Sequence, residues 1–217
     1  MAIACEEGAD WVWVMDDDVA PAASCLAELL RWREHSECLQ PRKVNPDGSE
    51  FPNEGYHDVK TGSGYSVNNL SFKNGKKIIY TNGGCFEGML ISRRIIDIVG
   101  FPDKKYFICN DDMLFALKAS IHTSVASVSD ALLNKLVMPG KSPAWKSYYF
   151  VRNTIFLHRD ACEYFNIDLG FWARFRFILL RIVDAAGHAR RGFRHVKPSI
   201  AGFVDGMRYL YNSKDGR

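Results

Sequence analysis

An apolar run followed directly by three aspartates constrains this chain most strongly. Residues Trp11-Val-Trp-Val-Met15 are all apolar, and Asp16, Asp17 and Asp18 follow without a break. Such a run is typical of a strand buried on both faces, as in the middle of a parallel sheet. In open α/β sheets, ligands bind beyond the carboxyl ends of the strands. We therefore expect an α/β fold in which these aspartates line a ligand crevice.

A second acidic cluster follows another predicted strand. Tyr106-Phe-Ile-Cys109 reads as a short strand, and it leads through Asn110, Asp111 and Asp112 into an amphipathic helix over 113–119. Acidic residues suit the positive end of a helix dipole. If both strands belong to one sheet, the two acidic clusters converge on one crevice.

Local signals place the remaining elements. Gly8 ends a short helix, and Pro21 lies in the first turn of a helix over 22–35. Residues 40–80 are rich in Pro, Gly and Asn, and we expect a substrate-facing loop region with a hairpin at 72–80. Further along, we expect helix 93–99 stopped by Gly100, strand 124–128, a helix from Ser142 to about Arg159, and helices 171–186 and 199–211.

Composition excludes several classes of protein. The chain has 217 residues, with 47% hydrophobic and 24% charged residues, which is typical of globular rather than disordered or collagen-like proteins. It has no apolar run long enough for a membrane-spanning helix. The six cysteines show neither CxxC pairs nor metal-type spacing, and we expect reduced thiols and a cytoplasmic location.

The three consecutive aspartates point to a metal ion. Like charges this close raise one another's pKa unless a cation intervenes. Carboxylate oxygens suit Mg²⁺ or Mn²⁺, and alternate residues of an extended segment point the same way, so that Asp16 and Asp18 can address one ion. The alternative is a solvated helix N-terminus capped by Asp18.

Four motifs, in order, resemble those of a known enzyme family. They are Trp11–Pro21 with its three aspartates, Gly84-Cys-Phe86-Glu-Gly88-Met-Leu-Ile-Ser-Arg93, Gly100-Phe-Pro102 through Asp112, and Tyr148-Tyr-Phe-Val-Arg152-Asn153. Together they resemble the inverting family 2 glycosyltransferases, with the closest likeness to the bacterial galactofuranosyltransferase and rhamnosyltransferase branch. The resemblance covers roughly residues 2–160.

The resemblance implies a GT-A fold, a mixed sheet flanked by helices. It also implies a nucleotide-diphosphate sugar donor such as UDP-galactofuranose or dTDP-rhamnose, a cell-envelope glycan or lipid-linked acceptor, and Mn²⁺ or Mg²⁺ held by Asp16 and Asp18. Asp111 falls at the position of the catalytic base, and we assign Asp17 and Asp112 to substrate binding. Inverting displacement needs a cation on the leaving diphosphate and a base on the acceptor at the opposite face, which fits two separate carboxylate clusters.

Three further residues are candidates for substrate binding. Gly84 permits close approach of the backbone to a ligand, and Phe86 can stack on a sugar; the alternative is a glycine-rich strand entry with Phe86 in the core. Arg152 matches the family's aromatic-Arg-Asn motif and can pair with phosphate, or it can form a structural ion pair. Asn134 stands where relatives commonly place a metal-ligating histidine.

The family's first strand, helix and second strand, which bind the nucleotide, have no counterpart ahead of residue 2. We therefore expect an N-terminally truncated GT-A domain. The alternative function is a non-catalytic remnant or a partner-dependent subunit. A two-metal phosphotransferase or nuclease would use similar carboxylates but leaves the motifs at Gly84–Gly88 and Arg152 unexplained.

The C-terminal segment differs in charge from the rest. Residues 1–170 carry 18 basic and 22 acidic side chains, whereas residues 171–217 carry 10 basic and 3 acidic ones. We expect a glycosyltransferase domain over 1–165 and a basic helical region over 166–217. The aromatic, arginine-flanked helix at 171–186 suits peripheral contact with an anionic membrane on its inner face, or it packs on the sheet with Arg181 paired to Asp184. No motif for nucleic acid accompanies the charge, and we expect no nucleic-acid partner.

Overall fold

The computed structural model describes residues 1–68, 71–72, 75–138, 140 and 142–211. Contacts within the chain divide it into two compact units. Unit 1 comprises Met1–His57, Gly64–Pro102 and Phe115–Pro139, and unit 2 comprises Asp58–Ser63, Asp103–Leu114 and Gly140–Arg217. Helix α5 (Lys146–Tyr164) therefore belongs to the same unit as the C-terminal helices. The boundary predicted at residue 165 would have placed it in the N-terminal domain.

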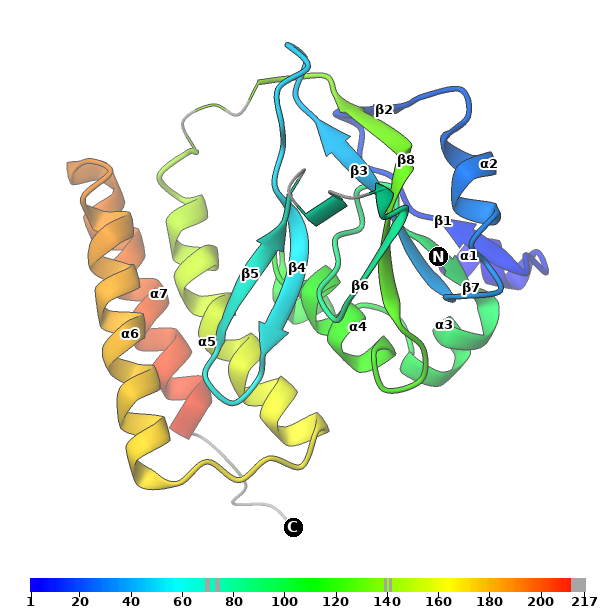
Figure 1. The fold of residues 1–217 in the computed structure, drawn as a ribbon. Coiled ribbons are helices and arrows are strands. Elements are labelled where there is room, and N and C mark those ends of the chain that lie inside the picture. The colour runs from blue at the N-terminus through cyan, green and yellow to red at the C-terminus, as the bar shows by residue number, and fades with distance from the viewer. Residues whose placement is uncertain (69–70, 73–74, 139, 141, 212–217) are drawn as a thin grey trace. The chain divides into compact units, whose positions relative to one another are not determined.

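Unit 1 is built on a six-stranded mixed sheet (Figure 1). The order is β1 (Trp11–Trp13), β7 (Leu90–Ser92), β3 (Cys38–Val44), β8 (Val125–Lys135) and β2 (Val19–Pro21), and β6 (Ile78–Thr81) also pairs with β8. Strands β3 and β8 are parallel, and the other pairs in this sheet are antiparallel. Strands β4 (Asn53–Asp58) and β5 (Ser63–Val67) form a separate two-stranded sheet.

Helices cover both faces of the six-stranded sheet. Helices α1 (Ala2–Glu6) and α3 (Arg93–Val99) and the C-terminal part of α4 (Asp111–Ala119) pack on one face, and α2 (Cys25–Leu30) packs on the other. Successive strand residues point to opposite faces. Thus Cys38, Ile91 and Val125 join the first core, and their neighbours Leu39, Leu90 and Ala126 join the second. The predicted α/β class is confirmed at this level: a mixed sheet flanked by helices.

Helix α3 has the predicted bounds. The Ser92 hydroxyl accepts a hydrogen bond from the amide N–H of Ile95 (3.2 Å), which caps the N-terminus of the helix. Gly100 ends it with φ of 83°, a conformation that glycine adopts at little cost. Both capping signals lie within a few residues of the helix ends, which explains why the sequence predicts the bounds of α3 correctly.

The prediction that Trp11–Met15 forms the middle of a parallel sheet is wrong. Strand β1 lies at one end of the sheet order and pairs antiparallel with β7. Its side chains are apolar because helices cover both faces of the sheet, which does not require a strand on each side: Val12 belongs to the core on the α1 face, and Trp11 and Trp13 pack against the core on the α2 face.

Two further elements differ from expectation. Val19–Pro21 forms strand β2, paired with the end of β8, and Pro21 therefore lies in an edge strand, where its missing N–H is tolerated. Residues Lys104–Tyr106 form a short 3-10 helix in place of the predicted strand at 106–109. Positive φ angles at Ile108 (73°) and Asn110 (69°) interrupt any extended run there.

The loop-rich region at 40–80 contains more regular structure than predicted. Strand β3 occupies its start, in the centre of the sheet, with a register shift between Pro41 and Arg42. A proline in a central strand is tolerated at such an irregularity. Lys73 and Asn74 of the predicted hairpin lie outside the described residues, and Ile78–Thr81 pairs with β8.

Unit 2 is dominated by three long helices, α5, α6 (Phe171–Ala189) and α7 (Phe193–Tyr211) (Figure 1). Two glycines let α7 approach α5 closely. A Cβ at Gly202 would lie 2.3 Å from the carbonyl oxygen of Tyr148, and one at Gly206 would lie 2.6 Å from a methyl of Ile155. Among the described residues, no helix combines the length and apolar character that crossing a bilayer requires.

Candidate functional site

Three carboxylates of unit 1 gather at one end of its sheet. Asp16, Asp18 and Glu87 each place a carboxylate oxygen within 4.8 Å of the others. Asp16 is exposed, whereas Asp18 and Glu87 are partly buried. This cluster joins two of the predicted metal ligands to a third carboxylate from a distant part of the chain.

Strand pairing brings the three residues together. Strand β1 ends just before Asp16 and β7 begins just after Glu87, and because the two strands are antiparallel these ends meet. The indole N–H of Trp13 donates to the carbonyl of Gly88 (2.8 Å), which fixes the junction. The segment after β1 then leads from one edge of the sheet to β2 at the other, and Asp18 lies just before β2.

Two lysines lie among these carboxylates. The Lys135 ammonium contacts Glu87 Oε1 at 2.6 Å and Asp18 Oδ2 at 3.1 Å. The Lys43 ammonium contacts Glu87 Oε2 at 3.0 Å and Glu54 Oε2 at 2.8 Å. Both lysine side chains are at least nine-tenths buried, whereas a lysine is rarely buried without a partner. Glu87 therefore links two buried cations at the centre of the cluster.

The electrostatics of the cluster follow from this arrangement. Although Asp16 is exposed, neighbouring atoms partly desolvate its carboxyl group, which raises the pKa, and the charges of Glu87 and Asp18 raise that pKa further. Burial alone would raise the pKa of Glu87 too, but Lys43 and Lys135 outweigh it and hold that pKa below its ordinary value. The carboxylates Glu54 and Glu87 raise the pKa of Lys43 despite its burial. Asp16 is thus the carboxylate whose charge is least well compensated.

The donor set fits a hard divalent cation. Mg²⁺ and Mn²⁺ prefer carboxylate oxygens, and three of these lie within reach of one ion. A bound cation would also relieve the repulsion that raises the pKa of Asp16. Such an ion would compete with the Lys135 ammonium, which already bridges Asp18 and Glu87.

The structure places the other residues predicted in unit 1 outside this triad. Asp17 is exposed and lies in the chain between Asp16 and Asp18, the two aspartates of the cluster. The Asn134 side-chain amide donates to the carbonyl of Ala20 (3.3 Å), across the β2–β8 pair. The next residue, Lys135, has its side chain at the cluster instead.

Gly84 and Phe86 lie close to the hydrophobic core. A Cβ at Gly84 would lie 2.4 Å from the terminal methyl of Met89 and 2.8 Å from the side chain of Ala116. Phe86 is partly buried and its ring is 5.5 Å from that of Phe115. These contacts favour the alternative in which Phe86 packs in the core, and they place Gly84 there as well.

Asp111 and Asp112 open helix α4. Burial raises the pKa of Asp111, and hydrogen bonds from its own backbone N–H and from that of Asp112 oppose the rise. The Asp112 carboxylate accepts a hydrogen bond from the amide of Met113 (2.7 Å). Both aspartates therefore contribute to the helix N-terminus, and Asp111 retains the raised pKa that a general base can use.

Arg152 of α5 has a structural environment within unit 2. Its guanidinium donates to the carbonyl of Lys105 (2.7 Å) and to the side-chain oxygen of Asn153 (2.8 Å). It also lies over the rings of Tyr149 and Phe156, about 5 Å from each centroid. These contacts resemble neither the predicted phosphate contact nor an ion pair with a carboxylate.

Sequence reasoning missed Glu87, Lys43 and Lys135 as parts of the site. Glu87 lies inside one of the four motifs, and a charged residue three positions before the buried strand β7 was a usable signal. The two lysines gave no such signal because they lie in or at the ends of strands whose neighbours come from distant segments.

Comparison with known proteins does not identify a family. No family model matches the chain, and no curated protein matches it. The resemblance to glycosyltransferases therefore stays a prediction from the motifs.

Proposed function

We propose that this protein is a metal-dependent glycosyltransferase with a GT-A-like domain. It would move a sugar from a nucleotide-diphosphate sugar to a glycan or lipid-linked acceptor by inverting displacement. The observation that carries this proposal is the convergence of Asp16, Asp18 and Glu87 beyond the end of β1. The sugar chemistry is supported by the order and spacing of the four motifs.

The carboxylates of unit 1 would hold the cation. Asp16 and Asp18 are the ligands that the motif predicts, and Glu87 adds a third oxygen donor within 4.8 Å. When bound, Mg²⁺ or Mn²⁺ supplies positive charge that stabilises the leaving nucleoside diphosphate. Before a cation binds, Lys135 holds Asp18 and Glu87 in position by its two ion pairs.

Asp111 is the residue we propose as the base that takes the proton of the acceptor hydroxyl. Its burial raises the pKa of the carboxyl group, which makes the carboxylate a stronger base. Its position as the first residue of α4 fixes its backbone, because the helix begins there. Asp112 is already engaged by the Met113 amide and is the poorer candidate.

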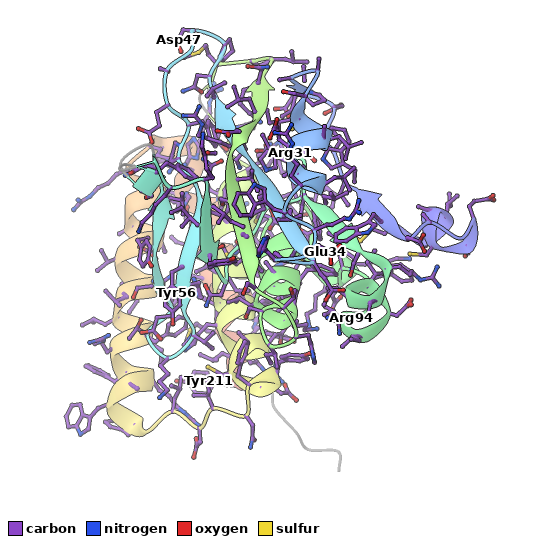
Figure 2. The ribbon with its side chains drawn as sticks, turned by 45° about the vertical axis from the view of Figure 1, so that its right-hand side comes forward. Arg31, Glu34, Asp47, Tyr56, Arg94 and Tyr211 are labelled. Carbon is purple, nitrogen blue, oxygen red and sulfur yellow. The ribbon has the colours of Figure 1, made fainter. Side chains whose placement is uncertain are left out.

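Calorimetric titration with Mn²⁺ and UDP tests the metal site. The wild-type chain should bind UDP only when Mn²⁺ is present, and Asp18→Asn should weaken Mn²⁺ binding by more than about tenfold. Asp47→Asn is the matched control, because Asp47 is an exposed carboxylate on the turn that follows β3 (Figure 2). Equal loss in both variants would rule out a specific site.

The Asp111→Asn variant separates binding from chemistry. It should bind Mn²⁺ and UDP as the wild type does, and it should lose release of UDP from UDP-galactofuranose or of dTDP from dTDP-rhamnose in the presence of acceptor. Turnover close to that of the wild type would remove Asp111 from the mechanism.

One observation favours a second function, a non-catalytic or partner-dependent protein. Lys43 and Lys135 already pair with Glu54, Glu87 and Asp18, so two of the negative charges at the cluster are balanced without a metal. Such a cluster can act as a structural ion-pair network. A wild-type chain that binds neither Mn²⁺ nor UDP would establish this alternative.

A further inference from the structure

Helix α6 presents two different faces. On its packed side Phe177 is 2% exposed and its ring stacks on that of His158, with the centroids 3.6 Å apart. Arg181 is also on this side, and its guanidinium pairs with Asp184 at 2.9 Å. The predicted pairing of Arg181 with Asp184 is confirmed, whereas within unit 2 this helix packs on α5 and α7.

The other side of α6 is apolar and exposed. At 100° per residue, six large side chains fall within about 120° of the helix circumference. They are between 48% and 77% exposed to solvent. A continuous exposed apolar patch usually marks an interaction surface. We call this surface the outer face of α6: Phe171, Trp172, Phe175, Leu179, Ile182 and Val183.

The first turn of the outer face is aromatic. The rings of Phe171, Trp172 and Phe175 contact one another, with centroid separations of 5.4 to 6.4 Å. Among the described residues no other ring contact is recorded for these three, and Phe171 and Trp172 are more than 70% exposed. Aromatic side chains on one face of an amphipathic helix are typical of the membrane–water interface.

Basic residues accompany the outer face. Arg176 lies beside it on the helix surface and is exposed, and Arg190 and Arg191 follow the last turn. The segment 171–217 carries 10 basic and 3 acidic residues in all. An anionic lipid surface attracts such a segment, and a long arginine stem can lie along the apolar face while its guanidinium meets lipid phosphate.

We propose that the outer face of α6 binds the surface of an anionic phospholipid bilayer, with the helix in the plane of the interface. Over its 19 residues the helix would extend about 28 Å along the surface. A second copy of the chain is a poorer occupant, because pairing two outer faces would bring together two segments with the same positive charge. The proposal does not depend on the proposed function, since neither metal nor donor takes part.

Vesicle flotation of the full chain tests the proposal. The chain should float with phosphatidylcholine vesicles that contain phosphatidylglycerol, and much less with phosphatidylcholine alone or in high salt. Phe175→Ser should weaken binding by about tenfold, because the aromatic side chain that the bilayer would bury is lost. Arg176→Gln should weaken it by about fivefold, because one charge near the surface is lost.

Two controls match these variants. Phe101→Ser changes a phenylalanine of similar exposure (54% against 50%) at the end of α3, and Arg31→Gln changes an exposed arginine of unit 1. Neither should alter flotation. Circular dichroism should show the same helix content in all four variants.

Several results would overturn the proposal. Absence of flotation with the vesicles that contain phosphatidylglycerol, or a loss of flotation in the Phe101→Ser control equal to that in Phe175→Ser, would reject lipid binding by this face. A wild-type dimer in light scattering that Phe175→Ser dissociates would assign the face to a second copy instead. Because the assay contains no divalent metal, these results leave the Mn²⁺ and UDP titration unaffected.

Discussion

At the scale of single residues, Glu87 determines the geometry of the carboxylate cluster. Its carboxylate accepts hydrogen bonds from the ammonium groups of Lys43 and Lys135, and it lies beside Asp16 and Asp18 in the cluster. Its side chain is only 14% exposed, so that its removal leaves Lys135 with Asp18 alone and Lys43 with Glu54 alone. We therefore expect Glu87 to matter for stability as well as for metal binding.

Glu87→Gln should lower the free energy of unfolding by about 2 kcal/mol at neutral pH, because two buried ammonium groups each lose a partner. The pKa of Glu87 is held below its ordinary value of 4.5 in the folded chain. Its stabilising contribution is therefore complete above that value and is lost as the pH falls through the folded-state pKa. Urea unfolding of both proteins at neutral and acidic pH measures the difference.

Glu34→Gln provides the control for this experiment. Glu34 is 82% exposed and lies on the surface of unit 1 (Figure 2). Its replacement should change the unfolding free energy by less than about 0.5 kcal/mol at either pH. If Glu87→Gln lowers the free energy of unfolding by the same amount at neutral and low pH, the effect does not come from the ionised carboxylate.

At the scale of elements, the approach of α7 to α5 depends on glycine. Gly202 faces the backbone of Tyr148 and Gly206 faces Ile155, at distances that exclude a Cβ without a shift of one helix. Gly187 in α6 is also a glycine within a helix, but a Cβ at this position would have no atom within 4 Å. The two kinds of position should respond to alanine in opposite directions.

Gly202→Ala should destabilise the chain by about 1–3 kcal/mol, because the added methyl would overlap the Tyr148 carbonyl. Gly187→Ala should stabilise it by about 0.5–1 kcal/mol, because alanine loses less conformational entropy in a helix. Denaturant unfolding followed by far-ultraviolet circular dichroism measures both. Equal effects of the two substitutions would mean that close packing at Gly202 does not limit the α5–α7 contact.

At the scale of the whole molecule, the chain consists of two units with separate sets of contacts. All three residues of the candidate metal site belong to unit 1, and the proposed lipid-binding helix belongs to unit 2. Ligands of the two sites should therefore stabilise different parts of the chain, if each unit unfolds on its own.

Mn²⁺ at about 100 times its dissociation constant should slow amide hydrogen exchange in β1, β7 and β8. The free energy of opening in these strands should rise by up to about 2.7 kcal/mol. Exchange in α6 and α7 should be unchanged. Hydrogen exchange read by mass spectrometry, with Ca²⁺-free buffer and with Asp18→Asn as the control, measures this. Equal protection of both units would show that they open as one cooperative unit.

Much of the local structure was predictable, because the signals act within a few residues. Ser92 and Gly100 bracket α3, and the acidic residues at 111 and 112 begin α4, as expected. The strand at 124–128 was found, but it extends to Lys135 because it pairs with β2, β3 and β6 along its length.

Two of the three carboxylates could be read from the chain, whereas Glu87 and the two lysines could not. Asp16 and Asp18 follow an apolar strand, a pattern visible in consecutive residues. Glu87 and Lys135 join them only because β1 pairs with β7 and β2 pairs with β8, and both pairings connect segments more than 70 residues apart. No local pattern encodes which distant strand becomes a neighbour.

The sequence by itself determined the α/β class, the caps of α3 and the aspartates that follow β1, because propensity, capping and periodicity are properties of short segments. Only the tertiary structure decided that β1 lies at the edge of the sheet, that two buried lysines compensate the carboxylates, and which side of α6 stays exposed. These features depend on contacts between residues far apart in the chain, and burial sets both their charge balance and their exposure.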